Sequence, residues 1–151
     1  PDHIRTHQIT MAAVAEVADP ALFPGLGEPW QVLKVYYNQQ FSKARVEALH
    51  LAMIDADLDS PYHDWVTRWD DQPDYIDRVT TKVPAADWFE LRDRALLAHR
   101  TQIDPESMWF KVPRDFQQRV WPTEDFELAM SLVETSLPED DLFAGLRDGA
   151  S

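Results

Sequence analysis

The sequence PWQVLKVYYNQ occupies residues 29–39 and is rich in the β-branched and aromatic residues that favour strands. It follows FPGLGEP, residues 23–29, where two Gly and two Pro in seven residues indicate a loop. We therefore expect a strand at residues 31–37. Since strand side chains alternate between two faces, Lys34 and Tyr36 are predicted to share one face and Tyr37 to lie on the other.

Helices are predicted on both sides of this strand from the spacing of apolar residues. Ser42 is suited to cap one of them, and Pro84 is suited to the first turn of another. The expected helices cover residues 3–18, 42–58, 62–69, 84–102, 114–120 and 123–133, and a second strand is expected at 78–83. Helices with two or three strands predict an α/β or α+β fold, and two strands are too few to cover three helices. Part of the sheet is therefore expected outside this chain.

Composition excludes several classes of function. The 151 residues are 44% hydrophobic, which supplies the core of one domain, and the formal net charge of -13 without a basic cluster argues against nucleic-acid and membrane-surface binding. No apolar run approaches the roughly 20 residues that span a bilayer, and PDHIRTHQIT at the start lacks the pattern of a secretory signal. The absence of Cys leaves His, Asp and Glu as possible metal ligands and fits a cytosolic setting.

Two acidic segments are expected to be solvated loops. Residues 70–75, DDQPDY, indicate a polar loop, and residues 138–151 indicate a loosely attached acidic end. The carboxylates of Glu139, Asp140 and Asp141 are expected to face water. The aromatic residues at 65, 69, 88, 89, 109, 110, 116, 121 and 126 are expected to be predominantly core.

His3 and His7 lie four residues apart and therefore on one face of the first predicted helix. Such a pair can bind zinc, but the metalloprotease form needs a Glu directly after the first His, and Ile4 stands there. Spacing alone favours ordinary polar residues in the first turns of a helix. It also leaves a metal site open.

His99 and Gln102 end the helix predicted at 84–102. A His at this position can donate a hydrogen bond to a substrate oxygen, and a Gln can bind an amide or a sugar hydroxyl. The simpler interpretation is that His99 caps the helix and the residues after it are exposed. Spacing alone favours the capping role.

Four segments taken together resemble the LmbE-like de-N-acetylase superfamily and, within it, the mycothiol S-conjugate amidases. The resemblance is collinear and extends over essentially the whole chain. It is carried by PDH at 1–3, PWQVLKVYYNQ at 29–39, ALLAHRTQIDP at 95–105, and WPTEDFELA at 121–129 followed by EDDLFAGL at 139–146. It implies the C-terminal portion of a Rossmann-like α/β hydrolase that is broken before Pro1. Residues 1–29 would then form the end of the metal-site core and a loop, and residues 30–151 would form the C-terminal substrate-side region.

The resemblance also implies roles for individual residues. The His-Pro-Asp-His motif of the family ends in a zinc ligand, which corresponds to His3, and its Asp, which corresponds to Asp2, supports the first motif His. That first His is absent from this chain, as is the earlier Ala-His-Pro-Asp-Asp-Glu segment that supplies the other ligands and the general base. One of three protein ligands of Zn2+ is therefore assigned here, and the segment alone is expected to be inactive.

The implied reaction is zinc-dependent hydrolysis of the amide between the S-substituted cysteine and glucosaminyl-inositol in mycothiol S-conjugates, a cytoplasmic detoxification step. The implied partners are this small thiol conjugate and the missing N-terminal part of the same protein. His99 and Gln102 lie in a segment that recurs in the family, and they are the expected substrate contacts together with Lys34 and Tyr37. A Tyr on such a strand is more often half-buried with its hydroxyl at the rim. Two alternatives remain. One is the related deacetylase of mycothiol biosynthesis, and the other is a non-catalytic binding module on the same scaffold.

Overall fold

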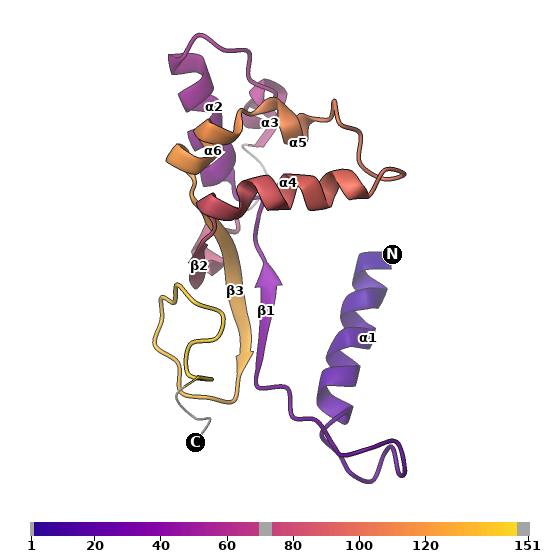
Figure 1. Ribbon diagram of the computed structural model, residues 1–151. Helices are drawn as coiled ribbons and strands as arrows, with labels where there is room; N and C mark the ends of the chain where they lie inside the picture. Colours follow the sequence, from indigo (N-terminus) through magenta and orange to yellow (C-terminus); the bar gives the residue numbers. More distant parts are fainter. Residues whose placement is uncertain (1, 70–73, 148–151) are drawn as a thin grey trace.

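The computed structural model describes residues 2–69 and 74–147, in which most helices gather at one end of a three-stranded antiparallel sheet (Figure 1). The strands are β1 (Lys34–Asn38), β2 (Thr81–Pro84) and β3 (Thr123–Ser131), in the spatial order β1-β3-β2. β3 is the longest strand and pairs along one edge with β1 and along the other with β2. The predicted α/β class, with helices and a few strands, is confirmed.

β3 replaces the helix predicted at 123–133, and that prediction was wrong. Glu, Leu, Ala and Met in this segment have high helix propensity, but pairing with two neighbouring strands overrides a weak local preference. Phe126 lies opposite Asn38 of β1 and Thr81 of β2, so both ladders meet at this residue. Phe126 and Leu128 alternate with Asp125 and Glu127, which is the period of a strand, up to a register shift opposite Val35 and Tyr36 of β1.

The other predicted elements are confirmed, most of them with shifted ends. Pro84 belongs to β2 rather than to the following helix, since it lies opposite Thr123 in the sheet. Asp57 adopts a left-handed φ of 56°, a conformation that a helix cannot continue, just beyond the end of the second helix. The helices are α1 (Asp2–Glu16), α2 (Lys43–Asp55), α3 (His63–Arg68), η2 (Ile76–Arg78), η3 (Ala86–Trp88), α4 (Phe89–Ala98), α5 (Met108–Lys111) and α6 (Arg114–Val120).

Of the loop expected at 70–75, residues 70–73 lie outside the described residues. No helix of the described ranges has both the length and the apolar character needed to cross a membrane.

The core forms where α2 meets the helices at one end of the sheet (Figure 1). Ser42 caps α2 as predicted, because its hydroxyl accepts a 3.1 Å hydrogen bond from the backbone N–H of Arg45. The buried apolar cluster consists of Val46, Leu49, Met53, Tyr62 and Val112. α5, which the sequence did not predict, follows a short loop and brings Met108 against this cluster.

α1 lies beside β1, apart from this core (Figure 1). Within the described residues, none of the side chains of α1 is buried, and Ile4 and Ile9 are more than half exposed. The helix contacts the sheet region through the ring of His7, whose centroid lies 5.5 Å from that of Tyr37. The apolar side of α1 therefore remains available for packing against further structure.

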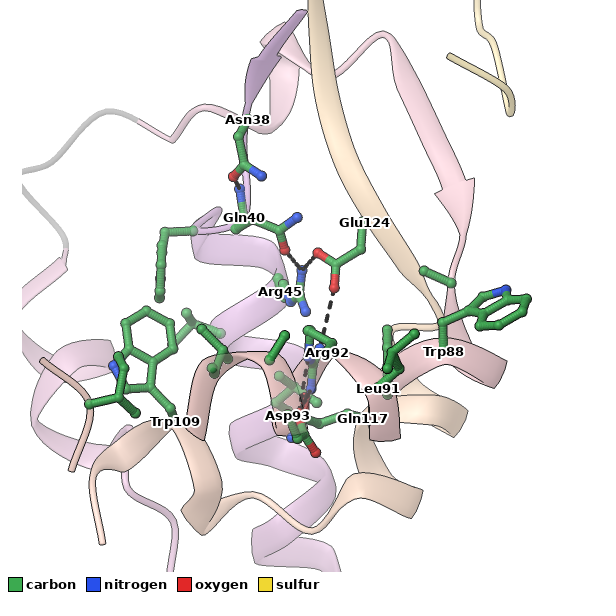
Figure 2. A pocket seen from close by; sticks show the side chains of 18 of the residues that line it. Asn38, Gln40, Arg45, Trp88, Leu91, Arg92, Asp93, Trp109, Gln117 and Glu124 are labelled. Carbon is green, nitrogen blue, oxygen red and sulfur yellow. Dashed lines mark hydrogen bonds and ion pairs between the residues drawn. The ribbon is translucent and has the colours of Figure 1, made fainter. Parts of the chain in front are cut away.

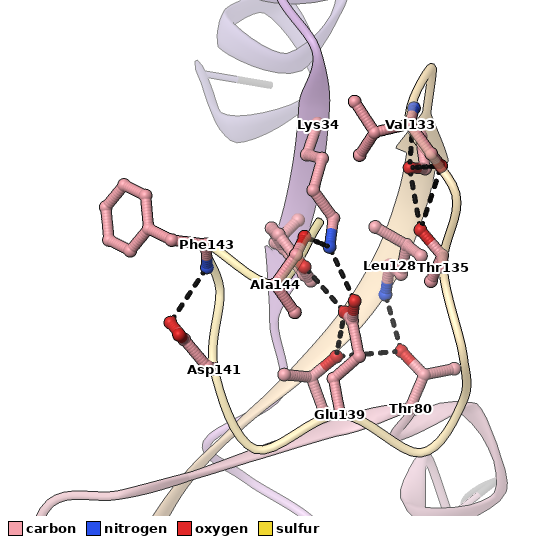
Figure 3. A network of polar contacts seen from close by, with 12 residues as sticks. Lys34, Thr80, Leu128, Val133, Thr135, Glu139, Asp141, Phe143 and Ala144 are labelled. Atoms are coloured by element: carbon pink, nitrogen blue, oxygen red, sulfur yellow. Dashed lines mark hydrogen bonds and ion pairs between the residues drawn. The ribbon is translucent and has the colours of Figure 1, made fainter. Parts of the chain in front are cut away.

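The C-terminal tail is attached to the sheet through Glu139, in contrast to the expected loose acidic end. The Glu139 side chain is buried, its backbone N–H donates to the carbonyl of Thr80, and its own carbonyl accepts from Lys82. Figure 3 shows its carboxylate turned toward Lys34. The expectation that Glu139 is solvated was wrong, because its partners lie far away in the sequence. Residues 148–151 of the expected tail lie outside the described part of the chain.

Candidate functional site

The predicted metal residues Asp2 and His3 lie in the first turn of α1, and both are exposed. His7 follows one turn later, on the same helix face, and packs edge-on against Tyr37. Tyr37 therefore connects β1 to the helix that carries His3. The contact gives His7 a packing role. Among the described residues, the side chains of Lys34, His99 and Gln102 make no hydrogen bond, ion pair or ring contact with His7 or Tyr37.

Among the residues that the structure describes, no group of three or more His, Asp or Glu side chains is placed to hold a metal ion. His3 is a suitable ligand by chemistry and is sterically accessible, but a zinc site needs three or four protein ligands. The described residues therefore do not form a complete zinc site by themselves. The assignment of His3 and Asp2 stays a prediction.

Lys34 and Tyr36 share one face of β1, as the strand alternation predicted, and both bind Glu139. The Lys34 ammonium lies 2.5 Å from one carboxylate oxygen, and the Tyr36 hydroxyl donates a 2.6 Å hydrogen bond to the other (Figure 3). Lys34 also donates to the carbonyl of Ala144 at 3.1 Å. Burial alone would lower the pKa of Lys34, but its hydrogen bonds to Glu139 and Tyr36 outweigh burial and raise it. The ammonium is thus engaged in a structural ion pair in this arrangement.

His99 and Gln102 lie at the exposed end of α4. His99 is the C-cap residue, and its backbone N–H donates to the carbonyl of Leu96 at 3.0 Å. The carbonyl of His99 in turn accepts from the backbone N–H groups of Gln102 and Ile103. The capping interpretation of His99 is confirmed, and a substrate role for either side chain stays a prediction.

A cavity of about 720 Å³ lies between the end of β1, α2 and α4 (Figure 2). Its walls are mainly apolar and include several aromatic side chains. Trp88 and Trp109 stand on opposite sides of it in Figure 2. Phe41 packs against Trp109 with ring centroids 4.8 Å apart. This is the size and character of a pocket for a small molecule.

A network of charged side chains forms one wall of the cavity. Glu124, on β3, lies 3.6 Å from a guanidinium nitrogen of Arg45 on α2 and 3.3 Å from one of Arg92 on α4. Arg92 also donates to Asp93 at 2.9 Å and to the side-chain oxygen of Gln117 at 2.8 Å. One strand and three helices therefore meet at this wall (Figure 2).

Tyr62 lies beside the same network and lines the cavity. Burial raises the pKa of its phenol, while the positive charges of Arg45 and Arg92 partly oppose that shift. The hydroxyl is therefore neutral at physiological pH. It adds polarity to the cavity wall without adding charge.

This cavity and its charged wall have no local signal in the sequence. Trp88 and Trp109 are expected from the sequence to be core residues, yet they are 66% and 43% exposed, and Trp65 is also exposed. Phe89, beside Trp88, is buried as expected. The residues of the charged wall are up to 79 positions apart, so no local spacing could have joined Arg45 with Glu124.

Comparison with known proteins gives relatives over almost the whole chain. A mycothiol S-conjugate amidase of Streptomyces coelicolor is 59% identical over an alignment of 152 positions, which covers 99% of this chain and 52% of that protein. Two 1D-myo-inositol 2-acetamido-2-deoxy-alpha-D-glucopyranoside deacetylases of Frankia alni are more distant. Deacetylase 2 is 36% identical, and the alignment covers 85% of this chain and 45% of that protein. Deacetylase 1 is 37% identical, and the alignment covers 97% of this chain and 52% of that protein.

The chain spans about half the length of these curated relatives. No protein-family model and no solved structure matches it. The resemblance inferred from the four sequence segments is confirmed by these relatives, and so is the expectation that the chain corresponds to only part of the related proteins.

Proposed function

Because this chain resembles a mycothiol S-conjugate amidase over nearly its whole length, we propose that it is the C-terminal part of a zinc-dependent amide hydrolase acting on mycothiol S-conjugates. The enzyme cleaves the amide between the S-substituted cysteine and glucosaminyl-inositol, in a cytoplasmic step that removes electrophile-conjugated thiols. The observation that carries this proposal is the 59% identity with the amidase, against 36% and 37% with the two deacetylases.

His3 is the proposed zinc ligand from this chain, and Asp2 is a positioning residue. When bound, zinc lowers the pKa of a water molecule and polarises the substrate carbonyl. Both residues lie in the exposed first turn of α1, where their side chains are free to meet groups from another part of the protein. The remaining ligands and the general base then come from the part of the related proteins that this chain does not cover.

Asp2 acts in this proposal through the imidazole of the first motif His, which the resemblance implies. A carboxylate that accepts a hydrogen bond from one ring nitrogen of a His fixes its tautomer and its orientation. The other ring nitrogen can then stabilise the oxygen on which negative charge develops during amide hydrolysis. Removing this carboxylate therefore affects turnover more than metal content.

The test uses the full-length protein encoded by the gene, loaded with zinc and given two substrates in separate reactions. A mycothiol S-conjugate should yield the N-acetylcysteine S-conjugate and glucosaminyl-inositol. N-acetylglucosaminyl-inositol should release acetate much more slowly. Faster release of acetate would identify a deacetylase instead, and failure to process either substrate with zinc bound would favour a non-catalytic binding module.

A further inference from the structure

The cavity between β1, α2 and α4 has accessible apolar walls. Trp88 and Leu91 line it with 66% and 55% of their surfaces exposed. Its volume of about 720 Å³ lies within the range of about 300–1,000 Å³ that is typical of small-molecule sites. A bound apolar group would remove this indole and aliphatic surface from water, which is favourable.

The charges on the cavity wall are balanced among themselves. Arg45 and Arg92 both face Glu124, and Arg92 also pairs with Asp93. These two cations and two anions sum to zero, and each has an opposite charge within 3.6 Å. A charged ligand group could form an ion pair with one of these residues only by displacing the partner that the residue already has, whereas an uncharged group leaves the pairs intact. The cavity therefore favours a neutral, apolar or aromatic group.

The cavity also lies toward the end of α1 that carries His3. Asn38, at the end of β1, lines the cavity, and the preceding residue Tyr37 contacts His7. In Figure 1 α1 and β1 run in opposite directions, so the start of α1 lies toward the cavity end of β1. His3 is one helical turn beyond His7 in that direction, a rise of about 6 Å.

We propose that this cavity binds the apolar or aromatic substituent on the sulfur of the conjugate, and that it sets which conjugates are processed. The inference rests on the proposed function, because it places the scissile amide near His3 and the S-substituent in the cavity. A neutral thioether substituent has the chemistry that the paired charges and the indole walls accept. The charged wall then serves to hold β3 and the helices in place around it.

Ala95→Phe in the full-length protein tests this assignment, because Ala95 is an exposed residue of α4 on the cavity wall. The added ring fills space that a large substituent needs. Ala98→Phe is the matched control, since Ala98 is also exposed on α4 and is not part of the cavity wall. The measurement is the ratio of kcat/KM for an S-benzyl conjugate to that for an S-methyl conjugate.

We expect Ala95→Phe to lower this ratio by at least about tenfold, the scale on which hydrophobic pockets discriminate, and Ala98→Phe to leave it within about twofold. An unchanged ratio in Ala95→Phe would overturn the proposal. A parallel loss for both conjugates leaves the ratio unchanged and counts against it too, because it would mean that the rest of the protein covers this surface.

The wild-type protein separates this inference from the proposed function. Hydrolysis of the S-methyl conjugate by the wild type supports the amidase assignment whatever the ratio in the variants. If the wild type hydrolyses neither conjugate, calorimetric titration with the S-benzyl conjugate still tests the cavity. Binding that Ala95→Phe weakens by at least about tenfold and Ala98→Phe does not would support it, and equal binding by all three proteins would contradict it.

Discussion

The Lys34 ammonium lies 2.5 Å from the carboxylate of Glu139, 105 residues further along the chain, and the side chains of both are almost completely buried. The pair joins the edge strand β1 to the C-terminal tail. Tyr36 and Thr81 donate further hydrogen bonds to the same carboxylate, at 2.6 and 3.3 Å. Glu139 thus connects residues of β1 and β2, the two outer strands of the sheet.

Removing either charge of this pair should destabilise the full-length protein. Lys34→Met and Glu139→Leu should each lower the free energy of unfolding by about 2–4 kcal/mol, because each leaves one buried charge without its partner. The double variant should lose less than the sum of the two. Denaturant titrations of all four proteins give the coupling energy, and strict additivity would show that the two residues do not interact.

Acid should reduce the contribution of Glu139 to stability. Burial alone would raise the pKa of Glu139, but the hydrogen bonds from Lys34 and Tyr36 outweigh burial and hold it below its ordinary value of 4.5. A lowered folded-state pKa gives stability that is present above pH 4.5 and is lost as the pH falls through the folded value. The difference in Tm between wild type and Glu139→Gln should therefore shrink as the pH is lowered below 4.5.

Alkali should weaken the same ion pair by deprotonating Lys34. The raised pKa of Lys34 gives stability that is fully present below its ordinary value of 10.5 and is lost as the pH rises through the folded value. The double variant Lys34→Met/Glu139→Leu lacks both groups, so its Tm should show neither the acid loss due to Glu139 nor the alkaline loss due to Lys34.

For the acid prediction, a Tm difference between wild type and Glu139→Gln that stays constant from pH 3 to pH 7 would contradict the role of the ion pair.

If the proposed function holds, His3→Ala should remove the bound zinc that it assigns to the full-length protein. Mutation of a residue that only orients a metal ligand typically lowers metal affinity by about 10–100-fold. Loss of a direct ligand should therefore weaken zinc binding by more than about 100-fold. Metal analysis after dialysis measures the stoichiometry. His7→Ala is the matched control on the same helix face and should keep the metal, since His7 contacts Tyr37. Normal zinc content in His3→Ala would remove His3 from the site.

Asp2→Asn should separate metal binding from turnover. The variant should keep stoichiometric zinc while kcat falls by about 10–100-fold, because the carboxylate orients a catalytic group and does not hold the ion. Steady-state kinetics and metal analysis on the same sample measure both. Unchanged kinetics would exclude Asp2 from the mechanism.

Residues 1–151 expressed alone should neither bind zinc tightly nor hydrolyse an amide, since His3 is the one zinc ligand assigned in them and the described residues form no group of metal ligands. The exposed apolar residues of α1, such as Ile4 and Ile9, should favour association of this segment. Adding the remaining part of the protein should restore metal binding, cooperative unfolding and activity together. Tight stoichiometric zinc with turnover in the segment alone would show that this segment holds a complete site.

Local sequence signals were sufficient for several elements of the fold. Ser42 identified the start of α2 because capping depends on neighbouring backbone N–H groups. The alternation that placed Lys34 and Tyr36 on one face of β1 is equally local, and Glu139 receives hydrogen bonds from both. The helix at 114–120 was predicted with its observed bounds.

The errors arose where distant partners determine the structure. Residues 123–131 consist partly of good helix formers, and the two neighbouring strands make them a strand. Glu139 lies in an acidic stretch that is typical of a solvated end, and Lys34 cannot be identified as its partner from spacing. The cavity depends in the same way on Arg45, Arg92 and Glu124, which come from three separate elements.

The position of β3 in the middle of the sheet has a consequence for the order of events during synthesis. β1 and β2 do not pair with each other, and each needs β3, which follows them in the chain. On the ribosome, the backbone groups of Lys34–Asn38 that pair with β3 must therefore stay unpaired until Thr123–Ser131 has emerged from the exit tunnel. Such late, non-local pairing is slow to form. A nascent chain that stalls before residue 123 should leave this edge of β1 open to proteases and to chaperones that bind extended segments.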